Sequence, residues 1–153
     1  MKEIKRMLLI SRMERDSPKV FHYAVSLCHK LEAELFVMHS VHNPFGGEGW
    51  NLPVPNLEEE YKKLLADTRK KLEAMIAGEK QNGMKITEII ATGEPTHDIL
   101  KTIKEQQIDL LVMAAHSEGK LEHMLFGRSQ EEIIRRLPCS LMLVKSEPGP
   151  VGY

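Results

Sequence analysis

Residues 108–128, IDLLVMAAHSEGKLEHMLFGR, constrain the fold of this chain most strongly. Residues 110–113 form a continuously apolar run, which is typical of a strand buried on both faces of a parallel sheet. A polar loop follows, and Gly127 stands where the next helix begins. A strand that leads through a loop to a glycine at a helix start is a common phosphate site in α/β proteins. The stretch therefore predicts an α/β fold with a candidate anion site after this strand.

Strand and helix patterns alternate along the rest of the chain. Four further apolar runs are typical of strands: residues 7–10, 33–41, 85–91 and 139–145. Apolar residues at helical spacing predict four helices. The first starts at residues 16–18, where Asp16 or Ser17 can cap it and Pro18 suits the first turn, and it runs to residue 31. The others run from 57 to about 78, from 95 onward, and over 129–136. With right-handed crossovers, this alternation predicts a doubly wound five-stranded parallel sheet flanked by helices.

The helix predicted from residue 57 has an unusually regular apolar stripe. Its composition resembles a coiled-coil seam, but it spans barely three heptads, so we predict a surface helix packed on the sheet. The residues on one side are Leu57, Tyr61, Leu64, Leu65, Thr68, Leu72, Met75 and Ile76.

Length and charge limit the class of protein. The 153 residues predict one domain over residues 1–146 and a frayed tail over 147–153. With 21 basic and 22 acidic residues, the net charge is -1, which gives no indication of nucleic-acid or membrane-surface binding. Cys28 and Cys139 form neither a disulfide framework nor a metal pair, and no apolar run has the length of a membrane span. We therefore expect a cytoplasmic protein.

Residues 42–56, HNPFGGEGWNLPVPN, form a long loop with three prolines and three glycines. Loops of this length usually have a function or are mobile. Phe45, Trp50, Leu52 and Val54 either bind an unknown protein partner or fold onto their own domain. The sequence leaves both alternatives open.

Three segments resemble the universal stress protein family. GEPTHDILKTIKEQQIDLLVMAAHS resembles the family pattern G-x-P…I…D-L-I-V-M-G-x-H-G, and KLEAELFVMHSV matches its usual second strand. GRSQEEIIRRLPCSLMLVK resembles the family's last helix and strand. The matches occur in order and cover nearly the whole chain. The resemblance implies a sheet of order 3-2-1-4-5, similar to the adenine-nucleotide alpha hydrolases, and a homodimer paired through the last strand.

The predicted dimer interface is the apolar last strand, at Leu141, Met142, Leu143 and Val144. An apolar strand exposed at a sheet edge is an aggregation hazard, so pairing with a second copy is physically reasonable. The alternative is burial of these side chains within the monomer.

The family's nucleotide-binding motif is degenerate in this chain. Nucleotide-binding members carry Gly, two residues, Gly, nine residues, Gly, then Ser or Thr; these positions are Ala114, Ser117, Gly127 and Arg128 here. The family also places an acidic residue after the first strand, where this chain has Arg12. Only Gly127 matches. The tentative nucleotide-site residues are Ser11, Arg12, Met113, Ala114, His116, Ser117, Gly127, Arg128 and Ser129.

These replacements weaken the site in two ways. A Cβ at Ala114 or Ser117 costs about 1–2 kcal/mol if a left-handed backbone is required, and it fills space that a phosphate needs. Backbone N–H groups survive and Arg128 adds a positive charge, so an anion could still sit at this helix start. Glu131 and Glu132 in the first turn oppose it.

Other chemistry has weaker support. His39, His42 and His116 all end predicted strands, but they lack the spacing of a metal site, and the family carries histidines at two of these positions. Ser117 beside His116 lacks the sharp turn of a nucleophile elbow. We expect no catalytic residues and no metal.

We therefore predict a cytoplasmic, dimeric, non-catalytic protein of the universal stress type, with a lost or altered nucleotide site and no cofactor. The alternative is an ATP- or AMP-binding member of the same type that acts as a nucleotide-dependent sensor, with or without slow ATP hydrolysis. The resemblance alone carries the biological role, because a fold does not define a function.

Overall fold

The computed structural model describes residues 2–11, 17–41, 43, 56–115 and 131–145. Five parallel strands form one sheet of order β3-β2-β1-β4-β5. The strands are β1 (Arg6–Ser11), β2 (Glu34–Ser40), β3 (Ile86–Ala91), β4 (Leu110–Ala115) and β5 (Ser140–Lys145). The helices are α1 (Ser17–Leu31), α2 (Leu57–Gln81) and α3 (Pro95–Glu105), and residues 131–136 are also helical. The predicted fold class and strand order are confirmed.

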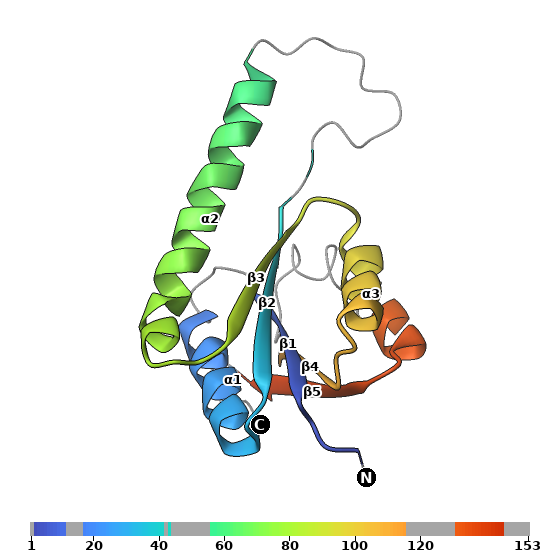
Figure 1. Ribbon diagram of the computed structural model, residues 1–153. Coiled ribbons are helices and arrows are strands. Elements are labelled where there is room, and N and C mark those ends of the chain that lie inside the picture. Colours follow the sequence, from blue (N-terminus) through green and yellow to red (C-terminus); the bar gives the residue numbers. More distant parts are fainter. Residues whose placement is uncertain (1, 12–16, 42, 44–55, 116–130, 146–153) are drawn as a thin grey trace, which may run out of the picture.

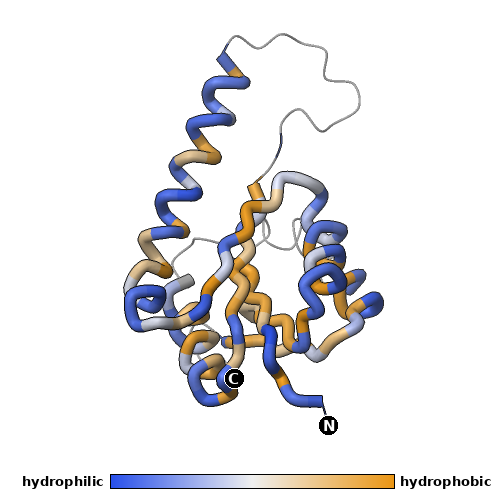
Figure 2. Tube along the Cα trace, in the orientation of Figure 1, coloured by the Kyte–Doolittle hydropathy of each residue, from blue (hydrophilic) through white to orange (hydrophobic). Residues whose placement is uncertain are grey.

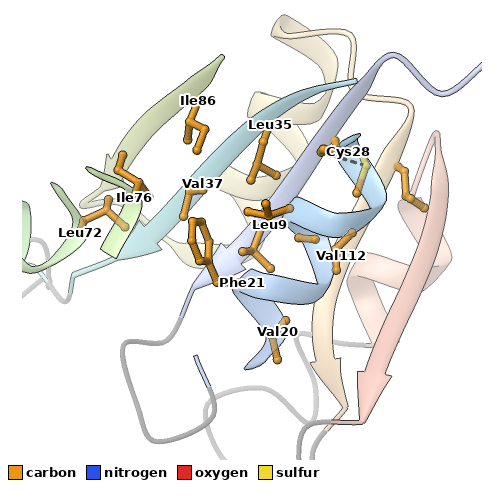
Figure 3. Packing of buried hydrophobic residues seen from close by; sticks show 14 residues of the cluster. Leu9, Val20, Phe21, Cys28, Leu35, Val37, Leu72, Ile76, Ile86 and Val112 are labelled. Carbon is orange, nitrogen blue, oxygen red and sulfur yellow. Dashed lines mark hydrogen bonds between the residues drawn. The ribbon is translucent and has the colours of Figure 1, made fainter. Parts of the chain in front are cut away.

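Helices cover both faces of the sheet (Figure 1). Alternate side chains of each central strand point to opposite faces, so Met7 and Leu9 pack with α1 and α2 while Leu8 packs with α3. Figure 3 shows the first of these layers, where Phe21 and Val20 of α1 and Leu72 and Ile76 of α2 meet the strands. The strands are apolar along most of their length (Figure 2), as burial on both faces requires.

Most predicted bounds agree with the structure to within one or two residues. Helix α2 ends at Gln81, three residues later than predicted, and β4 continues through Ala115. The alanines that extend β4 lack the bulk that marks a strand in sequence, but the β5 register pairs Ala115 with Lys145.

Asp109 joins the starts of two central strands. Its Oδ2 accepts hydrogen bonds from the backbone N–H groups of Lys5 and Arg6, each at 3.0 Å, and its Oδ1 lies 2.8 Å from Lys2 Nζ. The contact with the Lys2 ammonium lowers the pKa of Asp109 most; partial burial opposes it, and the two N–H groups reinforce it. Asp109 therefore aligns the start of β1 with the start of β4.

The two cysteines lie on opposite faces of the sheet. Cys28 packs in the layer of α1 and α2, whereas Cys139 packs against the layer of α3, so they cannot form a disulfide within the chain. Both are free thiols. Among the helices that the structure describes, none is long and apolar enough to cross a membrane.

Candidate functional site

The predicted site lies at the topological switch point, where the order in which strands are added to the sheet reverses. From β1 the chain winds toward β2 and β3, whereas β4 and β5 lie on the other side of β1. Ligands of doubly wound sheets bind beyond the carboxyl ends of the strands at this switch point. Here the switch point is between β1 and β4, which end at Ser11 and Ala115.

Ser11 has a buried hydroxyl at this point. It is only 5% exposed, and its Oγ has no hydrogen-bond partner among the described residues. A buried hydroxyl without a partner costs free energy, so such a group usually meets water or a ligand. Ser11 shares a sheet face with Met7 and Leu9, the face toward α1.

His39 lies beside Ser11 on the neighbouring strand. The two residues are paired in the β1–β2 register, and His39 Nδ1 lies 2.8 Å from the carbonyl oxygen of Ser11. A carbonyl oxygen only accepts, so Nδ1 carries the hydrogen in this arrangement, which leaves Nε2 as the nitrogen that can contact a ligand. From the sequence, His39 is a candidate only as a metal ligand. Its place beside Ser11 depends on the register between β1 and β2, which the spacing of residues along the chain does not contain.

Met113 and Ala114 are the predicted site residues at the end of β4, and only Ala114 lies on the same sheet face as Ser11. Ala114 shares the α1 face, and its methyl packs against the same core layer as Leu9. Met113 points to the opposite face, where it is 4% exposed and packs with Ile99 of α3. Met113 can therefore contribute its backbone to a ligand site, but its side chain belongs to the core.

The other predicted site residues lie outside the described part of the chain. They are Arg12, His116, Ser117, Gly127, Arg128 and Ser129. His42 and residues 44–55 are outside it as well, so the interaction of that loop with a protein partner stays a prediction. Among the described residues, no group of three or more His, Cys, Asp or Glu side chains could hold a metal ion.

The start of α3, which follows β3 at the same sheet edge, is already occupied by carboxylates. Glu94 caps the helix by accepting hydrogen bonds from the N–H groups of Thr96 and His97, at 3.1 and 2.6 Å. Asp98 accepts from the N–H of Gly93 at 2.9 Å, and a Cβ on Gly93 would lie 2.8 Å from that carboxylate. These bonds use the N–H groups that an anion would need.

A hollow of about 300 Å³ lies at the opposite edge of the sheet, where β2 and β3 begin. Cys28 lines it, but the thiol is 1% exposed and burial raises its pKa to about 12. Because the hollow is far along the strands from Ser11 and Ala114, it is not the switch-point site. Its lining residues are Cys28, His29, Glu32, Ala33, Asn82, Gly83, Met84 and Lys85.

The strand order places the chain in the class of doubly wound parallel α/β proteins. Within that class, the model of the "Universal stress protein family" matches residues 3–145. The chain belongs to the universal stress protein family.

Two relatives from Methanocaldococcus jannaschii illustrate the similarity. The chain is 29% identical to universal stress protein MJ0577 over 101 residues, which cover 65% of this chain and 62% of that protein. It is 28% identical to universal stress protein MJ0531 over 128 residues, which cover 80% of this chain and 71% of that protein. The first match thus spans less than two thirds of its relative.

Solved structures share the fold. The structure of hypothetical protein MJ0577 superposes with a TM-score of 0.74 at 20% identity, over 95% of this chain and 99% of that one. A universal stress protein in complex with cAMP superposes with a TM-score of 0.61 at 14% identity, over 95% and 100%. A universal stress protein from Archaeoglobus fulgidus in complex with dAMP gives 0.61 at 15% identity, with the same coverage. These similarities support the fold. The bound nucleotides, cAMP and dAMP, are properties of the last two proteins.

Proposed function

We propose that this universal stress protein is a dimeric, non-catalytic module of the cytoplasmic stress response, with an altered nucleotide site. The observation that carries the proposal is the methyl group of Ala114, which faces the α1 side of the sheet at the switch point. The family pattern has glycine at this position. The methyl already packs against the core, so it occupies space on the face where Ser11 also lies.

The sequence changes around the site reinforce this argument. Arg12 replaces an acidic residue that would accept hydrogen bonds from a ribose or an adenine, and guanidinium groups only donate. Ser117 and Arg128 replace a glycine and a hydroxyl residue of the family motif. We propose that these four replacements together abolish nucleotide binding of the family type.

The exposed last strand supports the dimer. Strand β5 is the last in the sheet order, beside β4, and Leu143 is 50% exposed on it. Leu141, Met142 and Val144 are half-buried. Pairing of two β5 strands would satisfy their backbone groups and cover Leu143.

The second candidate is a nucleotide-dependent sensor that binds ATP or AMP. The buried Oγ of Ser11 favours it, because a ligand hydroxyl or phosphate would supply the partner that this oxygen lacks among the described residues. The first turn of α1, which is the next described element after Ser11, contains no acidic residue, and Asp16 stands directly before it in the sequence. Complexes of two related folds with cAMP and dAMP agree with this candidate.

Isothermal titration of the protein with ATP, AMP and cAMP separates the two candidates. The altered-site proposal expects no binding heat at micromolar nucleotide. Micromolar binding of any of the three would favour the sensor. In that case Ser11→Ala should weaken the affinity for the nucleotide by about tenfold, the value of one hydrogen bond to a charged group. The substitution removes only the hydroxyl and leaves the backbone of β1 as it is.

A further inference from the structure

Helix α2 extends beyond the sheet. It contains 25 residues, of which only Thr68, Leu72 and Ile76 are buried. Thr68 lies next to the midpoint of the helix and the other two lie in its second half, whereas the half that begins at Leu57 rises past the ends of the strands (Figure 1).

The apolar stripe of α2 continues along this projecting half. Leu57 and Leu65 are half-buried, and Leu64 is 49% exposed. They lie on the same broad face of the helix as Leu72, because offsets of 7, 8 and 15 residues place them about 20°, 80° and 60° from Leu72 around the helix axis. The surface that the lower half buries on the sheet is thus continued upward by apolar side chains. We call the segment 57–72 the α2 stripe.

The charges beside the α2 stripe are self-complementary. Glu58, Glu59 and Glu60 precede the midpoint between Leu64 and Leu65 by the same number of residues as Arg69, Lys70 and Lys71 follow it. When a second copy of the helix is laid antiparallel across that midpoint, each acidic triplet meets a basic triplet. A two-fold axis requires this kind of match, because the same patch must fit itself.

The number of residues per helical turn shows on which side of the α2 stripe each charged residue lies. Eleven residues make about three turns, so Glu58 lies above Arg69 on one flank of the stripe and Glu60 lies above Lys71 on the other. Glu59 and Lys70 also lie eleven residues apart, but on the side of the helix opposite the stripe. The flanking pairs would face the partner, and the third pair would face solvent.

We propose that two copies of this protein associate through an antiparallel pair of α2 stripes, with the two-fold axis between Leu64 and Leu65. Glu58 and Glu60 of each copy contact Arg69 and Lys71 of the other, and Leu64 and Leu65 are covered at the centre. This interface is separate from the proposed β5 dimer and does not depend on it.

The association is weak and sensitive to salt. The two helices overlap from Leu57 to Leu72 over about 22 Å, but Thr68 and Leu72 are already covered by the sheet, at 6% and 0% exposed. The partner can therefore cover apolar side chains only from Leu57 to Leu65, which places the interface below standard size. Rim ion pairs are screened by salt. We therefore expect a dissociation constant in the micromolar range or weaker, which rises with ionic strength.

Charge variants in the background Leu143→Lys, which removes the β5 contact, test the proposal by sedimentation equilibrium. Glu58→Lys with Glu60→Lys makes the flanks wholly basic, and Arg69→Glu with Lys71→Glu makes them wholly acidic. We expect each variant alone to dimerise at least tenfold more weakly than the background chain, and an equimolar mixture of the two to recover the affinity. Glu59→Lys and Lys70→Glu are the matched controls and should leave it unchanged.

Two results would overturn the proposal. One is a monomer at every concentration for the background chain, which would assign the α2 stripe to another occupant, such as residues 44–55. The other is self-association that ignores the flanking charges or responds equally to the controls. If Leu143→Lys does not fold, the same charge variants are tested in the unmodified chain. There, a weaker α2 contact should shift the equilibrium from larger species toward the β5 dimer.

Discussion

At the scale of single residues, the Asp109 side chain links the starts of β1 and β4. It accepts two backbone N–H bonds and one ammonium contact, and its side chain is 9% exposed. Asp109→Asn replaces one oxygen by an N–H₂ group that cannot accept. We expect the free energy of unfolding to fall by about 1–3 kcal/mol at pH 7, measured by urea denaturation.

The same substitution has a predictable pH dependence. The pKa of Asp109 is lowered in the folded protein from its ordinary value of 3.8, so the stability it contributes is present above pH 3.8. It is lost as the pH falls through the lower, folded pKa. The difference between the wild type and Asp109→Asn should therefore narrow in acid. An equal difference at pH 7 and at the acid end would contradict this assignment.

The cysteines should differ in reactivity. Cys28 is 1% exposed, its pKa is raised to about 12 by burial, and its thiol lies 3.3 Å from Met7 Sδ (Figure 3). Cys139 is less buried, although burial raises its pKa too. Because the thiolate is the reactive form, a thiol reagent at pH 8 should modify Cys139 first and Cys28 only on unfolding. Cys28→Ser and Cys139→Ser assign the two phases; equal rates would contradict the burial.

The sequence predicted which strand residues are buried better than it predicted how the site residues are arranged. Leu9 and Val112 are buried as their apolar runs indicated. The contact of His39 with the Ser11 carbonyl depends on the β1–β2 register, and the orientation of Met113 depends on which sheet face its strand position takes. Both are relations between strands, which spacing within one strand does not contain.

At the scale of elements, α2 divides into two parts of unequal burial. Leu72 is fully buried, and Leu64 is 49% exposed. Leu72→Ala should lower the free energy of unfolding by about 2–5 kcal/mol, whereas Leu64→Ala should change it by less than about 0.5 kcal/mol. Thermal or urea unfolding of the dilute protein measures both. Similar losses for the two variants would mean that the upper half is as buried as the lower.

The sequence predicted α2 from its apolar period but could not show where the stripe leaves the core. A stripe of constant spacing is the same in sequence whether a sheet, a loop or a second copy covers it. The position of α2 relative to the strand ends decides this, and that position follows from tertiary packing (Figure 1).

At the scale of the whole molecule, the β5 proposal predicts the oligomeric state. Light scattering at micromolar concentration should give a dimer for the chain that carries Glu58→Lys and Glu60→Lys, which removes the α2 contact. Leu143→Lys added to that chain should give a monomer, because a buried lysine at the strand pairing is costly. Tyr23→Lys, at an α1 residue that is 52% exposed, is the matched control. A dimer that survives Leu143→Lys would refute pairing through β5.

If the β5 contact and the α2 contact both form as proposed, two different two-fold contacts act on one chain. Such contacts produce a closed tetramer when the two axes intersect at right angles and open chains when the axes do not intersect. The family resemblance predicted the sheet order, which is confirmed, and the β5 dimer, which stays a prediction. The α2 contact was not contained in that resemblance, because it arises from the charge order of this particular helix.

We propose that four replaced residues, Arg12, Ala114, Ser117 and Arg128, are sufficient by themselves to close the nucleotide site. Calorimetric titration with ATP of the wild type and of a variant with Arg12→Asp, Ala114→Gly, Ser117→Gly and Arg128→Ser tests it directly. We predict no binding to the wild type and micromolar binding to the variant. Micromolar binding to the wild type, or its absence in a correctly folded variant, would contradict the claim.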